Sequence, residues 1–318
     1  MIDVLIADKF EHVGIEALSS IGLTFEYEPE LNDLSLQEKL ASSHAKILVV
    51  RSTKVTKQIL DASSLKLIIR AGAGYDTIDI DHAKSKSIKV ANCPGKNSVA
   101  VAELTLGLIL AIDRKIPDNV QFLREGTWNK KGFSKAKGLY GRTLGLVGFG
   151  KIAQEVTKRA KAFGLHVLVF SHWLTPEMAK SYGVTLLTNL KELARQSDIV
   201  SIHSALTSQT KYLINETFFE SMKEGAYFIN TSRAELVDSF ALEKALAHNK
   251  IFAGLDVFEG ELTSGEGFYS GNLRNFKNVY CTHHIGASTE QSQEAVASEV
   301  VKIIHQYMKD QTVLNEIV

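Results

Sequence analysis

The sequence has 318 residues, which is long enough for about two domains. Hydrophobic residues make up 45% of it and charged residues 23%, values that are ordinary for a soluble globular protein with a sizeable core. Its 36 lysines and arginines balance 36 aspartates and glutamates, so no overall field draws the chain to nucleic acid or to an anionic membrane.

The two cysteines, Cys93 and Cys281, lie far apart and match no metal-ligand spacing, so no metal site is predicted. The sequence shows neither a signal peptide nor an apolar run long enough to span a bilayer. We therefore expect a reduced, cytoplasmic protein that acts on a small molecule and has neither a membrane nor a nucleic-acid partner.

The first third of the chain alternates short apolar runs with helical patterns. Helices are predicted at residues 11–21 and 36–42, between the apolar runs. The runs themselves predict buried strands at residues 2–7, 46–50, 67–69 and 88–91. This alternation is typical of βαβ units, in which helices cover both faces of a mostly parallel sheet.

A long apolar helix is predicted over residues 97–116, and the lysine-rich segment 126–141 then interrupts the pattern. A second βαβ series follows it. Its predicted strands are residues 143–149, 166–170, 199–203, 226–230, 252–257 and 278–282. The last helical pattern, residues 290–308, has no new strand series to cover, so we expect it to return to the first domain.

The predicted fold is α/β, with two Rossmann-like, doubly wound parallel-sheet domains. The nucleotide domain is inserted in the substrate domain. Residues 1–96 and 290–318 are expected to form the substrate-binding (catalytic) domain, and residues 97–289 the dinucleotide-binding domain.

A glycine-rich turn follows the predicted strand 143–149. Gly148 permits the tight turn, Gly150 lets the backbone approach a pyrophosphate, and Ala153 still allows close helix packing. The following helix would offer unpaired N–H groups to the phosphates. Since strand, turn, helix and next strand fall where a dinucleotide fold requires them, we predict nucleotide binding here. The earlier AGAG run at residues 71–74 has no comparable helix after it, which favours a backbone turn.

The second strand of this nucleotide unit ends at Ser171, where such folds usually place an acidic residue for the ribose hydroxyls. Without a carboxylate the discrimination against a 2′-phosphate weakens, yet no arginine stands ready to bind one. The predicted cofactor is NAD, with NADP as the alternative.

Polar residues follow three later strands: Arg233, Asp256 with Glu261, and the pair His283 and His284. The carboxyl ends of strands in a doubly wound sheet face the ligand, so these residues are expected to line one cleft. Reduction of a keto acid requires a cation for the carboxylate, which suits arginine. It also requires an acid, which suits histidine, since the usual pKa of histidine is about 6.5 and a neighbouring glutamate raises that pKa.

The chain resembles the D-isomer-specific 2-hydroxyacid dehydrogenases over nearly its whole length. The resemblance is carried by VVRSTKVT, RAGAGYDTIDI, NCPGKNSVAVAEL, LGLVGFGKIA, SDIVSIHSALTSQT, NTSRAELVD, GLDVFEGE and HIGAST. By position it implies that Arg233, Glu261 and His284 are the catalytic residues. His283 stands where the family usually has proline.

The resemblance also implies the remaining site residues. Those for the cofactor are Gly148, Gly150, Lys151, Ile152, Ser171, Ser204, Thr231, Ser232, Asp256 and Gly286, with Asp256 near the nicotinamide. Those for the substrate are Arg51, Ala73, Gly74 and Lys130, and the backbone N–H groups of Ala73 and Gly74 would hold the substrate carboxylate.

The sequence departs from the family pattern at several places. Ala234 replaces the usual glycine after the arginine, Ala205 a usual proline and Ser171 the ribose aspartate. The run ELTSGEG stands where the family commonly has Glu-Pro. The three catalytic residues are intact, so activity is expected.

Within the family, VVRSTKVT and GTWNKKG are most similar to D-3-phosphoglycerate dehydrogenases, where basic residues meet the substrate phosphate. Arg51, Lys54, Lys130 and Lys131 are the candidates, and the alternative is a solvated basic loop. The resemblance thus implies an oxidoreductase that transfers a hydride between a nicotinamide cofactor and a D-2-hydroxy acid. The first candidate pair is D-3-phosphoglycerate and 3-phosphohydroxypyruvate, in serine biosynthesis.

The alternatives are a glyoxylate or hydroxypyruvate reductase, a D-lactate dehydrogenase, or, from another class, a nucleotide-sensing, corepressor-like binding protein. The intact catalytic set argues against the last. A homodimer is expected from the resemblance and from the lysine-rich segment 126–141, which looks like a cross-subunit arm. Because the chain ends at Val318, without the regulatory region of longer members, feedback by serine through such a region is not expected.

Overall fold

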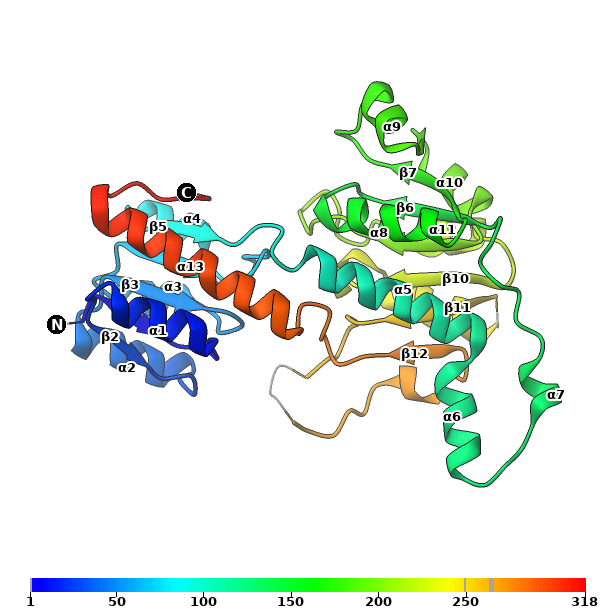
Figure 1. The fold of residues 1–318 in the computed structure, drawn as a ribbon, viewed down its shortest axis with the longest axis horizontal. Coiled ribbons are helices and arrows are strands. Elements are labelled where there is room, and N and C mark those ends of the chain that lie inside the picture. Colours follow the sequence, from blue (N-terminus) through cyan, green and yellow to red (C-terminus); the bar gives the residue numbers. More distant parts are fainter. Residues whose placement is uncertain (1, 249, 263–265) are drawn as a thin grey trace. The chain divides into compact units, whose positions relative to one another are not determined.

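A computed structural model describes residues 2–248, 250–262 and 266–318 of the chain (Figure 1). It divides into two compact units. The first unit comprises Met1–Asn97 and Ala287–Val318, and the second unit comprises Ser98–Gly286. The second unit is therefore an insertion in the sequence of the first.

The first unit contains a five-stranded sheet in the order β2-β1-β3-β4-β5, in which every pairing is parallel. Its strands are β1 (Val4–Ile6), β2 (Phe25–Tyr27), β3 (Ile47–Val50), β4 (Leu67–Arg70) and β5 (Lys89–Asn92). The sequence did not predict β2, because this edge strand is short, only partly buried, and carries the charged Glu26 between two aromatic residues.

Helices cover both faces of this sheet, and the strand residues alternate between two apolar cores. Val4 and Ile6 face a core shared with Leu18 and Ile303, whereas Leu5 faces the opposite core. The helices are α1 (His12–Ser20), α2 (Asp33–Ser43), α3 (Lys57–Asp61), α4 (Ile80–Ser85) and α13 (Glu290–Asp310). The last helix, α13, packs with α1 and so completes the first unit (Figure 1).

The second unit contains a seven-stranded parallel sheet in the order β12-β11-β10-β9-β6-β7-β8. The strands are β6 (Thr143–Val147), β7 (His166–Phe170), β8 (Thr185–Leu187), β9 (Ile199–Ile202), β10 (Ala226–Asn230), β11 (Ile251–Leu255) and β12 (Val279–Cys281). The edge strand β8 was not predicted, since it has three residues and none is fully buried.

The helices of the second unit also lie on both faces of its sheet. Ile109 of α5 and Val156 of α8 share one core, while Phe218 of α11 and Leu242 of α12 belong to the other. The helices are α5 (Ser98–Arg114), α6 (Ile116–Arg124), α7 (Lys130–Phe133), α8 (Lys151–Ala162), α9 (Pro176–Tyr182), α10 (Leu190–Gln196), α11 (Glu216–Ser221) and α12 (Ser239–Ala247), with 3-10 turns η1 (Ala234–Leu236) and η2 (Asn272–Asn275). Both units are thus doubly wound parallel α/β folds, which confirms the predicted fold class.

The single helix predicted over residues 97–116 is wrong at its end. α5 stops at Arg114, Lys115 takes a left-handed conformation with φ 49°, and α6 starts at Ile116 with Pro117 in its first turn. Proline lacks an N–H and its ring clashes with the preceding turn of a helix, so the chain starts a new helix there.

Among the described residues no helix is long and apolar enough to cross a membrane.

Candidate active site

The glycine-rich turn of the second unit joins β6 to α8. Gly148 has φ 93°, and a Cβ there would lie 2.6 Å from the carbonyl oxygen of His203, so only glycine fits. Gly150 is the N-cap of α8 and provides no side-chain cap, and a Cβ on it would meet nothing within 4 Å. The first-turn N–H groups of α8, which include those of Lys151 and Ile152, have no carbonyl partner within the helix, so they are available to phosphate oxygens.

Hydroxyl groups tie together the loops beside this turn. Ser204 Oγ donates to the carbonyl oxygen of Val147 (3.1 Å), and Ser232 Oγ donates to that of Ser204 (2.7 Å). Thr231 Oγ1 lies 3.1 Å from Thr105 Oγ1 inside the unit. The hydroxyls predicted to contact the cofactor thus also hold the strand-end loops in place, and their contact with a cofactor stays a prediction.

Ser171 comes directly after β7 and is half-buried. Aromatic side chains shape the same end of the strand. His172 packs edge-on against Phe170, with ring centroids 5.2 Å apart, and the ring of Trp173 lies 6.2 Å from that of Phe149. Since the serine hydroxyl is uncharged, this position does not repel a 2′-phosphate in the way that a carboxylate would.

His284 pairs with Glu261. The ring Nδ1 lies 3.0 Å from Glu261 Oε1, and this hydrogen bond is the main cause that raises the pKa of His284 above the usual 6.5. Burial and the charge of Arg233 oppose the shift, while the charges of Glu261 and Asp256 add to it. With Nδ1–H held by the carboxylate, Nε2 is the nitrogen that can give or take a proton, and about half of the side chain is exposed to a reactant.

Asp256 fixes the turn that presents His284. The carboxylate of Asp256 is 1% exposed and accepts the N–H groups of Ile285 and Gly286, each at 2.8 Å, and the hydroxyl of Thr282 at 2.6 Å. His284 itself has a left-handed φ of 52°, which costs a residue with a side chain about 1–2 kcal/mol. These three hydrogen bonds offset that cost. The Asp256 carboxylate is therefore an anchor of the turn, and its predicted place near the nicotinamide stays a prediction.

Asn230, which the sequence analysis did not single out, holds the loop of Arg233. It ends β10, is 1% exposed, accepts the N–H of Ser232 at 3.0 Å and donates to the carbonyl oxygen of Arg233 at 2.9 Å. The Arg233 side chain donates to the carbonyl oxygen of Ser232 at 2.7 Å. Its charge lowers the pKa of His284, so the two side chains are within electrostatic reach. A polar last residue on a buried strand was the available signal.

Two other histidines of this unit differ from His284. His203, at the end of β9, has Nε2 2.9 Å from Ser201 Oγ, and its buried Nδ1 has no hydrogen-bond partner among the described residues. Burial lowers the pKa of His203 to about 3, so this ring stays neutral and cannot supply a proton at neutral pH. His283 is exposed, and its side chain makes no hydrogen bond or ion pair to the part of the chain that the structure describes.

In the first unit, Asp8 anchors the loop after β3. Its Oδ2 accepts the backbone N–H of Arg51 at 2.6 Å and those of the next two residues at 3.1 and 3.0 Å. The Arg51 guanidinium donates to Gln293 Oε1 (3.2 Å) and to Ser288 Oγ (3.4 Å). Both of these partners are neutral, so they leave the positive charge of Arg51 available to an anion.

The turn after β4 carries the predicted carboxylate donors. Asn92 donates to the carbonyl oxygen of Ala73 at 2.6 Å, which fixes the peptide. The N–H groups of Ala73 and Gly74 have no acceptor among the described residues, so they are available to an oxygen ligand. The guanidinium of Arg70, which the sequence analysis did not select, lies against Gly72 and adds a positive charge beside this turn.

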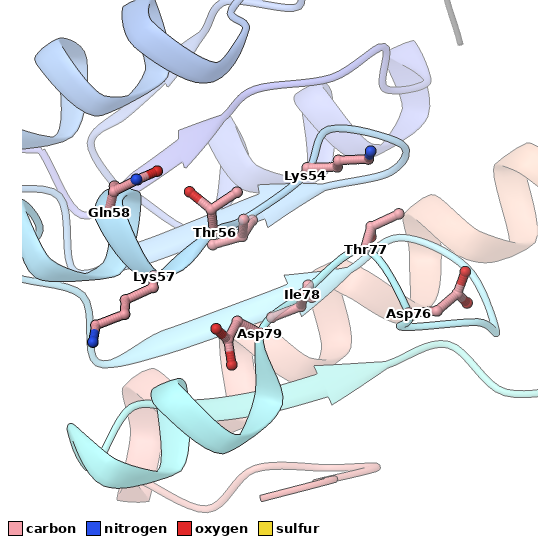
Figure 2. A pocket seen from close by; sticks show the side chains of 9 residues that line it. Lys54, Thr56, Lys57, Gln58, Asp76, Thr77, Ile78 and Asp79 are labelled. Atoms are coloured by element: carbon pink, nitrogen blue, oxygen red, sulfur yellow. The ribbon is translucent and has the colours of Figure 1, made fainter. Parts of the chain in front are cut away.

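Lys54 lines a surface hollow of about 430 Å³ in the first unit, together with Lys57, Asp76 and Asp79 (Figure 2). The side chains of Lys54 and Lys57 point away from each other. Two lysines that diverge, with two aspartates in the same wall, do not form a compact anion site. Arg51 is not part of this hollow.

Lys130 and Lys131 are exposed residues of α7, on the long connection from α6 to β6. Lys137, further along this connection, donates to the carbonyl oxygen of Gly225, which precedes β10 at the amino-terminal edge of the sheet. Figure 1 shows α7 beyond that edge, away from the carboxyl ends of the strands. The structure therefore does not bring Lys130 to the other candidate residues of its own unit.

The second unit thus combines a dinucleotide-type turn with a carboxylate-held histidine and an arginine loop on a doubly wound, Rossmann-type fold. Within residues 2–248, 250–262 and 266–318, no group of three histidine, cysteine, aspartate or glutamate side chains is placed to hold a metal ion. The chain belongs to the D-isomer specific 2-hydroxyacid dehydrogenase family, because residues 106–286 match the family's NAD binding domain. The resemblance seen in the sequence is confirmed.

Similar sequences and a similar crystal structure support this membership. The chain is 39% identical to D-3-phosphoglycerate dehydrogenase of Methanocaldococcus jannaschii over 99% of its own length, and it spans 59% of that relative. It is 43% identical to hydroxypyruvate reductase of Thermotoga maritima, over 81% of this chain and 83% of the relative. A crystal structure of a glyoxylate reductase from Paecilomyes thermophila matches with a TM-score of 0.87 and 28% identity, covering 99% of this chain and 98% of that one.

Proposed function

We propose that this chain is an NAD(P)-dependent oxidoreductase that interconverts a D-2-hydroxy acid and its 2-keto acid. The observation that carries the proposal is the His284–Glu261 pair, in which a hydrogen bond of 3.0 Å raises the pKa of the histidine within reach of the Arg233 charge. Turnover of a 2-keto acid with a reduced nicotinamide cofactor tests it. Nucleotide binding, seen by fluorescence, without turnover of any 2-keto acid would contradict it.

In the proposed reduction, Arg233 binds the substrate carboxylate and polarises the carbonyl group. His284 Nε2 gives its proton to the carbonyl oxygen, and Glu261 stabilises the charged ring before that step. A bound nicotinamide dinucleotide, held by Gly148, Gly150 and the start of α8, would supply the hydride. In the reverse direction the neutral ring takes the hydroxyl proton.

We propose that the second unit is the dinucleotide-binding domain and that NAD is its cofactor. Support comes from the match to an NAD binding domain and from the open N-terminus of α8. The uncharged Ser171 weakens discrimination against NADP. Comparing kcat/KM for NADH and NADPH measures the preference, and an advantage for NADPH would overturn NAD as the cofactor.

The proposed substrate pair is D-3-phosphoglycerate and 3-phosphohydroxypyruvate, which would place the protein in serine biosynthesis, with the first unit binding the substrate. Support comes from Arg51, whose partners are neutral, and from relatives named D-3-phosphoglycerate dehydrogenase. The experiment compares kcat/KM for 3-phosphohydroxypyruvate, hydroxypyruvate, glyoxylate and pyruvate. Arg51→Gln should raise KM for the phosphorylated acid more than for glyoxylate. Equal values for phosphorylated and plain acids would contradict a phosphate site.

A homodimer is proposed as the assembly. Helix α6 buries none of its residues, and Ile116, Val120, Phe122 and Leu123 leave a large apolar surface exposed. Leu123→Lys should lower the dimer fraction in sedimentation, whereas Leu34→Lys, at an even more exposed leucine of the first unit, should not. A monomeric mass for the unaltered protein would rule the dimer out.

The proposed location is the cytoplasm, and the two free cysteines, Cys93 and Cys281, are consistent with it.

A further inference from the structure

A second cavity, of about 320 Å³, lies in the second unit beneath the loop of Arg233. Asn230 and Ala234 border it on the side of that loop, and leucines of α12, β11 and η2 form its apolar floor. Neither Gly148, Gly150 nor the first turn of α8 lines it. The cavity is therefore separate from the proposed nucleotide cradle.

Two aromatic rings form one wall of this cavity. Phe258 and Tyr269 pack edge-to-face with centroids 5.3 Å apart, and both are only partly buried. Burial is the main cause that raises the pKa of Tyr269, and the nearby Glu243 contributes to the shift. The phenol is therefore protonated at neutral pH, and both aromatic residues border the cavity.

Two carboxylates, Glu243 and Glu259, complete the lining. Glu259 accepts a hydrogen bond from the hydroxyl of Ser239, and Glu243 accepts one from Asn272 Nδ2 at 3.1 Å. Both partners are neutral. Among the described residues neither carboxylate has a lysine, arginine or histidine within 4 Å, so neither is ion-paired. Glu243 is partly buried at the cavity, and Glu259 is exposed at its rim.

We propose that this cavity binds a small organic cation, namely a primary ammonium group attached to an aromatic or branched apolar body. The apolar floor and the two rings would bury the body. The ammonium would meet the carboxylates and the ring faces, an environment that favours a cation over a neutral polar group. An anion such as the keto acid is disfavoured there.

An occupant of the cavity would act on the segments that carry the proposed catalytic residues. The Asn230 side chain lines the cavity and also binds the backbone of Ser232 and Arg233. Phe258 lies between Asp256 and Glu261 in the sequence. A ligand that packs against these residues restricts the Arg233 loop, so its binding changes the turnover of keto acid. This second step rests on the proposed function.

The binding experiment uses 2-phenylethylammonium as the probe and isothermal titration as the readout, without cofactor or keto acid. The unaltered protein should bind the neutral 2-phenylethanol about tenfold more weakly than the probe. The double variant Glu243→Gln/Glu259→Gln should bind the probe about tenfold more weakly than the unaltered protein does. Glutamine keeps an acceptor for Ser239 and Asn272, so the fold is retained. Glu224→Gln, an exposed carboxylate before β10, is the matched control and should bind unchanged. Equal affinity of the probe for the double variant and the unaltered protein would overturn the site.

The coupling has its own measurement, which is the rate of keto acid reduction at a saturating concentration of the probe. A change in kcat that is absent in the double variant supports it. An unchanged kcat in an active enzyme that binds the probe would overturn the coupling and leave the site standing. If no keto acid is turned over, the proposed function fails, while the titration still decides whether the cation site exists.

Discussion

Two loops, one in each unit, are held by the same device, a carboxylate that accepts backbone N–H groups at the carboxyl end of a sheet. In the second unit Asp256 holds the turn of His284 through the N–H groups of Ile285 and Gly286. In the first unit Asp8 holds the loop of Arg51 and the next two residues. Asp256 is 1% exposed, whereas Asp8 is partly open to solvent.

The side chains that the two loops present have different partners. His284 faces a charged partner, Glu261, and its pKa is raised. Among the described residues, the partners of the Arg51 guanidinium are the neutral Gln293 and Ser288. A proton donor must be oriented and tuned before the reaction, whereas a group that binds an incoming anion must keep its charge available. The comparison thus supports the proposal that the loop held by Asp256 serves the chemistry and the loop held by Asp8 serves substrate recognition.

The largest change in kcat is expected from His284→Ala, which tests the loop of the second unit. Removal of the proposed acid should lower kcat for keto acid reduction by about 10²- to 10⁴-fold. Steady-state kinetics measures the loss, and cofactor binding by fluorescence shows whether the nucleotide site is intact. Retention of most of the activity would show that His284 is not the proton donor.

A pair of matched substitutions tests the two anchors directly. Asn in place of Asp256 replaces one carboxylate oxygen by an NH₂ group, so one buried N–H loses its acceptor at a cost of about 1–3 kcal/mol. We expect Asp256→Asn to lower kcat by about tenfold or more and to lower the melting temperature. Asp8→Asn should mainly raise KM for the keto acid and change stability less. Equal losses of kcat in both variants would contradict the division between chemistry and recognition.

Much of this arrangement could be predicted from the sequence. A strand, glycines at a fixed spacing and a helix specify the nucleotide turn locally, so Gly148 and Gly150 were predictable. His284 was selected from the resemblance, and its partner Glu261 lies 23 residues away. The two α/β units followed from the alternation of apolar runs and helical patterns.

The anchors could not be predicted in the same way. Asp8 and Asn230 are single polar residues at or near strand ends, and their role depends on which loop lies beside them. Asp8 binds a loop 43 residues away in the sequence, a contact that only the strand order of the sheet creates. The position of Lys130 also depends on tertiary structure, because a lysine in a long connection carries no signal for which edge of the sheet it reaches.

A smaller effect is expected on the pH dependence, through Glu261→Gln. Glu261 raises the pKa of His284, so reduction should persist up to a pH above 6.5 and fall as pH rises through the raised pKa. Glutamine removes the charge, and the fall should then occur at lower pH. Oxidation of the hydroxy acid needs the neutral ring and should show the opposite trend. An unchanged midpoint in the pH–rate profile would contradict the role of Glu261.

The smallest expected effect is that of His283→Ala. His283 is exposed and makes no hydrogen bond or ion pair within the described part of the chain, so its loss should change kcat by less than about twofold. The same kinetic assay and melting temperature measure it beside His284→Ala. Both histidines lie in one turn. If only His284→Ala lowers kcat, the reaction depends on the orientation that Asp256 and Glu261 impose on one imidazole, and not merely on an imidazole nearby. Equal damage from both changes would refute that conclusion.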